Sequence, residues 1–180
     1  MFVLPVDAEI DLVLGEERHA EEITALIVAN QRRLARWEPW AEQPATVSAL
    51  RGYLRTCLQG FAAGTQVQTY IRVDGRLVGS CGLRLDPGTR TGEVGYWVDA
   101  GVEGRGIATR SVRALVTAAF RDRGLGRMEL RTAVDNVRSR ALAERLGFVQ
   151  EGVHRAAQAF SDRRADIVLY AVLSREWRTN

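Results

Sequence analysis

The chain has 180 residues, of which 46% are hydrophobic and 26% are charged, and its formal net charge at pH 7 is +3. This length and composition are typical of one globular domain, residues 1–180, with a full hydrophobic core. The small net charge gives no reason to expect a nucleic-acid partner, and no apolar run reaches the roughly 18 residues of a membrane-spanning helix. The first ten residues lack a basic segment followed by an apolar stretch, so we expect no secretory signal and a cytoplasmic protein.

The two cysteines, Cys57 and Cys81, do not have the spacing of a metal-binding motif. We interpret them as buried, reduced thiols rather than as a disulfide, and we expect no metal in this protein. All 25 basic residues are arginines, and we place most of them on solvated faces.

The first third of the chain predicts one strand and two helices. Apolar and polar residues alternate over 9–14, which indicates a strand, and helical spacing follows over 17–36 until Pro39 interrupts it. A second helix is predicted from Thr46 to Phe61, with Thr46 or Ser48 as its N-cap.

From residue 66 onward the hydrophobic period changes from helical to two, and Asp74-Gly75 is a strong hairpin signal. The elements predicted after the second helix are strands at 66–73, 76–85 and 93–98, a helix that ends at Gly124, a strand at 127–134, a helix to about Leu146, and strands at about 148–160 and 166–173. Asp135 or Asn136 caps the helix that follows residue 134.

These elements predict a mixed α/β domain with about four helices and a mostly antiparallel central sheet. The strands of the meander must be antiparallel because their turns are tight. The strand at 127–134 follows a crossover helix, so it can lie parallel to the strand at 93–98.

The stretch "GVEGRGIAT", residues 101–109, opens directly into a helix. Helix N-termini present free N–H groups and partial positive charge, and glycines let a ligand approach the backbone, so this turn indicates an anion site, most simply for phosphate. A plain glycine-rich loop is the alternative. A P-loop requires a lysine that this chain lacks, and a dinucleotide fingerprint requires a glycine where Thr109 stands.

Two longer stretches resemble the GCN5-related N-acetyltransferases, and in particular their RimJ/RimL-like branch, which acetylates protein N-termini. They are "EVGYWVDAGVEGRGIATRSVRALV" (93–116) and "RTAVDNVRSRALAERLGFVQEG" (131–152). "NQRRLARWEPW" (30–40) and "RADIVLYAVLSREW" (164–177) are similar to two further regions of that branch. The resemblance implies acetyl-CoA as cosubstrate, and the family's sheet splays between its fourth and fifth strands.

The resemblance also implies the residues that hold the cosubstrate. Its pyrophosphate is expected on the backbone of the loop residues Glu103, Gly104, Arg105, Gly106, Ile107, Ala108 and Thr109. Arg105 can add charge at the rim, whereas the Glu103 carboxylate should point away from a diphosphate. The pantetheine arm is expected beside the backbone of Tyr96, Trp97 and Val98. Asn136 is expected to bond that arm, to cap its helix, or both.

Ser139 is the candidate acid that donates a hydrogen bond to the departing thiolate, and a polar residue in a first helical turn is the alternative. Many family members carry a tyrosine acid where this chain has Ala143. Glu93 is the candidate base, acting through a water, or else an ordinary cross-strand carboxylate. A peptide α-amine has a pKa of about 8 and lysine of about 10.4, so a site without an obvious strong base favours an α-amine.

The sequence therefore predicts an acetyl-CoA-dependent N-acetyltransferase whose acceptor is a protein N-terminus. The alternatives are transfer to a small amine, such as an antibiotic, polyamine or amino acid, and a non-catalytic acyl-CoA-binding module. Trp37 and Trp40 are expected to pack on the acceptor side, where Glu38 and Glu42 either attract a cationic amine or are solvated. A homodimer is an expectation carried over from the branch.

Overall fold

A computed structural model describes residues 2–178. Within them lie four α-helices: α1 (Ala20–Leu34), α2 (Val47–Ala62), α3 (Ile107–Arg123) and α4 (Val137–Arg145). The strands are β1 (Val3–Pro5), β2 (Ile10–Leu14), β3 (Gln66–Val73), β4 (Arg76–Asp86), β5 (Thr91–Val98), β6 (Arg127–Ala133), β7 (Val149–Ala159) and β8 (Arg164–Leu173). Short 3₁₀ turns are η1 (Glu17–His19), η2 (Pro39–Glu42) and η3 (Ala100–Val102). The predicted elements are confirmed, and β1 is an addition that the sequence did not indicate.

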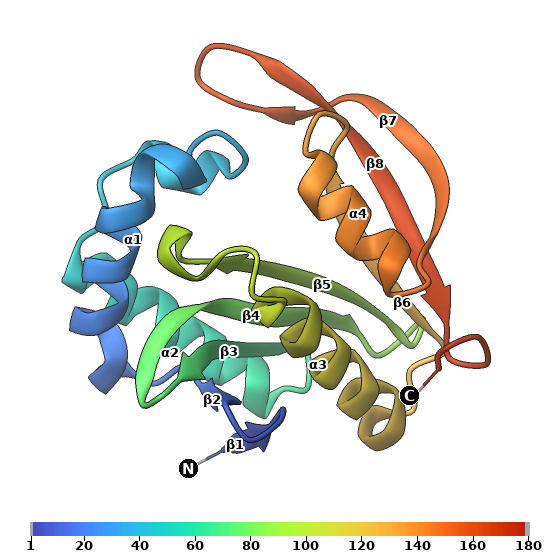
Figure 1. The fold of residues 1–180 in the computed structure, drawn as a ribbon, viewed down its shortest axis with the longest axis horizontal. Coiled ribbons are helices and arrows are strands. Elements are labelled where there is room, and N and C mark those ends of the chain that lie inside the picture. The colour runs from blue at the N-terminus through green and yellow to red at the C-terminus, as the bar shows by residue number, and fades with distance from the viewer. Residues whose placement is uncertain (1, 179–180) are drawn as a thin grey trace.

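The strands form one sheet in the order β1-β2-β3-β4-β5-β6-β8-β7. All neighbours are antiparallel except β5 and β6, as the crossover helix between them predicted. This parallel pair is short, because only Thr91–Glu93 of β5 pairs with Arg127–Glu129 of β6. Beyond Glu93 the two strands separate, and the sheet divides into two arms (Figure 1). We call this gap, bounded by residues 94–98 of β5 and by β6, the fork.

Two hydrophobic cores lie on opposite faces of the sheet. Helices α3 and α4 share one core with side chains such as Val94 of β5, Met128 of β6 and Tyr170 of β8. Helices α1 and α2 form the other core with Val13 and Tyr70. In Figure 1, α1 and α2 lie beside the β1–β5 arm, and α4 lies against the other arm. The fork is therefore a gap in the sheet that has α3 and α4 on one face and α1 and α2 on the other.

Local signals set the ends of several elements. Asp74 and Gly75 both have positive φ, at 48° and 80°, as the hairpin between β3 and β4 requires. Thr46, rather than Ser48, caps α2, and its side chain accepts a hydrogen bond from the Ala49 N–H at 3.2 Å. Cys57 and Cys81 are free and buried, as expected. No helix in residues 2–178 is long and apolar enough to cross a membrane.

Candidate active site

The glycine turn ends in a helix start with unpaired donors. Gly106 is the N-cap of α3, with φ 74° and ψ 4°, and Gly104 has φ 78°. The first backbone bond of the helix runs from the Arg110 N–H to the Gly106 carbonyl at 3.0 Å. Within residues 2–178, no protein atom accepts a hydrogen bond from the backbone N–H groups of residues 104–109. Six consecutive free amides at the positive end of a 17-residue helix are suited to bind a diphosphate.

The charged residues of this loop are already paired. The Glu103 carboxylate bonds Arg33 of α1 and Arg138 of α4. Two guanidinium groups therefore offset the repulsion that this carboxylate would exert on a diphosphate. The Arg105 guanidinium pairs with Glu9 in the turn between β1 and β2, so the charge that it contributes at the rim is shared with a carboxylate.

Helix α1 holds the loop between β5 and α3 in place. The buried Asn30 amide donates to Asp99 Oδ1 at 2.7 Å, and its carbonyl oxygen accepts from the Ala100 N–H at 3.1 Å. Arg33 donates to Asn30 Oδ1 at 3.0 Å and also to the Val98 carbonyl. The "NQRRL" stretch of the sequence thus positions the turn from which the free amides project.

Backbone alternation decides which peptide groups of β5 point into the fork. Val98 lies opposite Gly79 of β4, and the next N–H, that of Asp99, donates to the Val78 carbonyl at 2.7 Å. The Val98–Gly79 pair is therefore the non-hydrogen-bonded kind, and the peptide groups of Trp97 point to β4. The peptide groups that point into the fork are those of Val94, Tyr96 and Val98. Past Glu93 they have no partner in β6. Apart from the Val98 carbonyl, which accepts from Arg33, they are placed to pair with an extended amide-bearing chain.

Ser139 lies in the first turn of α4 and contacts β5 across the fork. Its N–H donates to Asn136 Oδ1 at 3.2 Å, which makes Asn136, rather than Asp135, the cap of α4. The Tyr96 hydroxyl lies 3.1 Å from Ser139 Oγ and donates to it. Burial raises the pKa of Tyr96 to about 12, with the Ser139 bond opposing that shift, so the phenol stays protonated at neutral pH. Ala143, one turn along α4, is fully buried and brings no polar group.

Glu93 stands at the last paired position of β5, on the sheet face opposite to Tyr96 because strand side chains alternate. Its carboxylate accepts a hydrogen bond from Arg84 at 2.5 Å and lies 3.7 Å from Arg131. The side chain is 25% exposed. Arg84 and Arg131 thus hold the predicted base at the point where β5 and β6 separate, and part of the carboxylate remains exposed to solvent.

A second carboxylate, Glu38, lies on the same face of the sheet at the N-cap of η2. It is half-buried and accepts a hydrogen bond from Trp40 Nε1 at 3.0 Å. Burial raises the pKa of the Glu38 carboxyl, while the charge of Arg84 lowers it and that of Glu93 raises it. The electrostatic influence of both groups places Glu38 near the Glu93–Arg84 pair.

The sheet between these carboxylates and β3 carries little side-chain volume. Gly95 of β5 is exposed and presents only backbone, whereas Gly82 of β4, which lies opposite, is covered by the Gln68 side chain. The neighbouring Gln68 donates to Ser80 Oγ at 2.8 Å and accepts from the Tyr53 hydroxyl at 3.1 Å. A floor of backbone and neutral polar groups, bordered by two carboxylates, suits an amine and the polar chain that carries it.

The turn between β7 and β8 is attached to η2 above this floor. The N–H and hydroxyl of Ser161 donate to Glu42, with the hydroxyl bond at 2.9 Å. Gln158 Nε2 donates to the Trp37 carbonyl at 3.3 Å. Glu42 is thus engaged in a structural contact with the turn between β7 and β8. Trp37 is half-buried and Trp40 is 48% exposed, so the second tryptophan packs less than expected.

Comparison with known proteins decides the family. The GNAT acetyltransferase domain matches residues 11–149 of the chain. The chain belongs to the GNAT acetyltransferase family.

Two curated relatives and one solved structure are similar to this GNAT acetyltransferase over most of its length. It is 36% identical to the putative ribosomal N-acetyltransferase YdaF of Bacillus subtilis, with 98% of each chain covered. It is 27% identical to the ribosomal-protein-serine acetyltransferase of Escherichia coli, over 93% of this chain and 94% of that one. RimJ of Mycobacterium smegmatis in complex with CoA-disulfide superposes with a TM-score of 0.86 at 25% identity, over 93% of this chain and 83% of that one.

The acetyltransferase uses acetyl-CoA as its acetyl donor, as the family does. The free amides of residues 104–109 fit its diphosphate, and the peptide groups of the fork that lack a partner in β6 fit its pantetheine arm. Sequence reasoning missed the Tyr96 hydroxyl and the links of Asn30 and Arg33 to the loop. No local signal could have found them, because each joins residues at least 43 positions apart.

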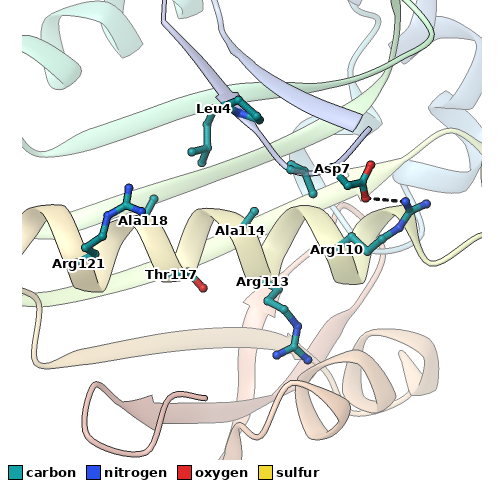
Figure 2. Close-up of a pocket in the computed structure, with 10 residues that line it drawn as sticks. Leu4, Asp7, Arg110, Arg113, Ala114, Thr117, Ala118 and Arg121 are labelled. Atoms are coloured by element: carbon teal, nitrogen blue, oxygen red, sulfur yellow. Dashed lines mark hydrogen bonds and ion pairs between the residues drawn. The ribbon is translucent and has the colours of Figure 1, made fainter. Parts of the chain in front are cut away.

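A groove of about 390 Å³ lies elsewhere on the acetyltransferase, between β1 and α3 (Figure 2). Leu4 and Asp7 border one side, and Arg110, Arg113 and Arg121 project from α3 on the other. Arg110 pairs with Asp7 at 2.7 Å, as the dashed line in Figure 2 marks. The groove contains none of the predicted site residues.

Proposed function

We propose that this acetyltransferase transfers the acetyl group of acetyl-CoA to the α-amine at a protein N-terminus, a ribosomal protein being the first class to test. The observation that carries the proposal is the acceptor side of the fork. It offers half-buried Glu38 and ion-paired Glu93 beside the exposed backbone of Gly95, and neither carboxylate is a strong base. An α-amine with a pKa of about 8 is roughly one quarter neutral at pH 7.5, whereas a lysine with a pKa of about 10.4 is almost entirely charged. The names of the two curated relatives support this acceptor class.

The donor is held from both ends in this proposal. The amides of residues 104–109 bind the diphosphate, the peptide groups of Tyr96 and Val98 flank the pantetheine arm, and Asn136 adds a side-chain bond. The thioester then lies in the fork between Ser139 on one side and the two carboxylates on the other. Residues 1–180 serve as one acetyltransferase domain.

The chemistry follows from this placement. The neutral amine nitrogen attacks the thioester carbonyl carbon, the C–S bond breaks, and sulfur leaves with the electron pair as a thiolate. Ser139 donates a hydrogen bond to that thiolate. The proton that the amine loses passes through water to Glu93 and then to solvent. Glu38 attracts the amine end of the acceptor to the fork.

The test is thiol release from acetyl-CoA with a panel of acceptors, followed by mass spectrometry of the products. The panel pairs peptides bearing a free N-terminus with the same peptides blocked at the N-terminus but carrying a lysine, and includes spermidine and an aminoglycoside. We expect acetylation at the free α-amine only. Product on lysine or on the small amines alone would refute the proposal, and CoA binding without release from any acceptor would favour the non-catalytic module.

Ser139→Ala tests the assigned donor in the same assay. A hydrogen bond to a charged group contributes about 1.5–3 kcal/mol, so kcat should fall roughly 10- to 150-fold. The Kd for CoA should change little because the diphosphate amides remain. An unchanged kcat would remove Ser139 from the mechanism.

A further inference from the structure

A hydroxyl pair joins the two sides of the fork at the point where the thiol group of the donor must lie. Tyr96 projects from β5 and Ser139 from the first turn of α4, and their oxygens are 3.1 Å apart. Within residues 2–178 this is the one hydrogen bond that the Ser139 side chain makes. The Ser139 backbone N–H donates a hydrogen bond to Asn136 Oδ1, which holds the backbone at this position. The orientation of the Ser139 hydroxyl is therefore governed by Tyr96.

We propose that Tyr96 is a positioning residue that turns the Ser139 O–H toward the departing thiolate and strengthens it as a hydrogen-bond donor. The inference rests on the proposed role of Ser139. When the phenol donates to Ser139 Oγ, the serine oxygen is occupied as an acceptor and its own hydrogen is free to point into the fork. A hydrogen bond accepted by Oγ also polarises the serine O–H, so the bond to the thiolate becomes stronger.

Both hydroxyl groups keep their protons in this step. The thioester C–S bond breaks and the sulfur leaves with the electron pair. The Ser139 O–H stabilises the resulting thiolate by donating a hydrogen bond to it. A thiol has a pKa near 8.5, so the thiolate needs a donor but no full proton transfer. The partly buried phenol suits this task because its raised pKa keeps it protonated. The groups that act on it are Cys81 on β4 and Arg145 on α4, together with Ser139.

The position of the phenol compensates for a group that α4 lacks. Many family members supply the donor as a tyrosine on this helix, and here the corresponding residue is Ala143, which is fully buried. A tyrosine from the facing strand, acting through a serine, brings a phenol to the thiol from the other side of the fork.

A second tyrosine provides a matched control. The Tyr170 hydroxyl of β8 also ties α4 to the sheet, since it accepts from Arg140 Nε at 3.1 Å and donates to Glu144 at 2.8 Å. Tyr170→Phe removes a buried phenol that anchors the same helix without contacting Ser139. If Tyr96 only anchors α4, the two substitutions should have similar effects.

The kinetic experiment is a double-mutant cycle on acetyl transfer, run with whichever acceptor the panel identifies. We expect Tyr96→Phe to lower kcat about three- to tenfold with little change in KM for acetyl-CoA. In the Ser139→Ala background the same substitution should change kcat less than about 1.5-fold, because there is no serine to orient. Tyr170→Phe should stay within about twofold of the parent in both backgrounds. Additive losses, or equal effects of the two phenylalanine variants, would overturn the proposal.

A binding experiment needs no acceptor, so it separates this inference from the acceptor proposal. The affinity of CoA relative to desulfo-CoA is measured by titration calorimetry at pH 7 and pH 9.5. A donor aimed at sulfur should make CoA progressively tighter than desulfo-CoA as the thiol ionises. Tyr96→Phe should reduce that gain by about threefold or more, and Tyr170→Phe should not. Identical pH profiles for wild type and Tyr96→Phe would contradict the proposal even if every peptide proved to be a substrate.

Discussion

Alanine at Gly106 should separate the stability of the α3 helix start from its capacity to bind a diphosphate. Gly106 has φ 74°, and a Cβ built on it meets no atom within 4 Å. The cost in the folded protein is therefore one residue in the left-handed region, about 1 kcal/mol. For a chain of this length that corresponds to a fall in Tm of about 2–4 °C.

The effect on the cosubstrate should be larger. A Cβ on Gly106 would occupy open space, and Gly106 lies within the run of free amides, residues 104–109, where the diphosphate is expected. Any relaxation of φ also turns the N–H groups of the helix start away from the anion. Loss of one charge-assisted hydrogen bond costs about 1.5–3 kcal/mol, so the Kd for CoA should rise roughly 10- to 150-fold.

The other end of the same helix supplies the control. Gly124 is the C-cap of α3 at φ 60°, also with nothing within 4 Å of an added Cβ, and lies about 25 Å away along the 17-residue helix. Gly124→Ala should lower Tm by the same amount and leave the Kd for CoA unchanged.

Thermal denaturation and CoA titration of both variants check this reasoning. Wild-type affinity in Gly106→Ala would show that the α3 N-terminus does not hold the diphosphate. Equal weakening in Gly124→Ala would show that the loss reflects helix destabilisation.

Two further predictions concern the acceptor side. Burial raises the pKa of the Glu38 carboxyl, so the folded protein binds the carboxyl proton more tightly than the unfolded chain does. The protein therefore loses stability as the pH rises from 4.5, the ordinary pKa of this group, through its raised pKa in the folded state. Glu38→Gln should therefore raise Tm at pH 7 but not below pH 4.5, and a difference of the opposite sign in a pH series of melts would contradict the burial argument. Glu42→Ala removes the acceptor of both Ser161 hydrogen bonds, so it should raise KM for the peptide about two- to tenfold while CoA affinity holds; a weakened CoA affinity would place Glu42 on the donor side instead.

The elements and their ends could be predicted from the sequence because their signals lie within a few residues. The Asp74-Gly75 turn and the glycine start of α3 depend on the dihedral angles of single residues, and the Thr46 cap depends on a hydrogen bond from the Ala49 N–H three residues along the chain. β1 escaped prediction because it is three residues long and includes Pro5, which leaves no periodicity to detect. The early separation of β5 from β6, after three paired residues, has no local signal either, and it was expected only from the resemblance to the family.

The sequence by its resemblance to a known family predicted the family and the donor. The glycine turn by itself predicted an anion site, because such a site at a helix start needs only consecutive free amides and the glycines that permit them. Tertiary structure decided the rest of the site. The sheet register aims the peptides of Tyr96 and Val98 into the fork and places Glu93 on the opposite face. Folding also brings the Tyr96 hydroxyl to Ser139 across 43 positions and joins Glu103 to Arg33 across 70. Such contacts depend on strand register and helix packing, and no window of neighbouring residues encodes those.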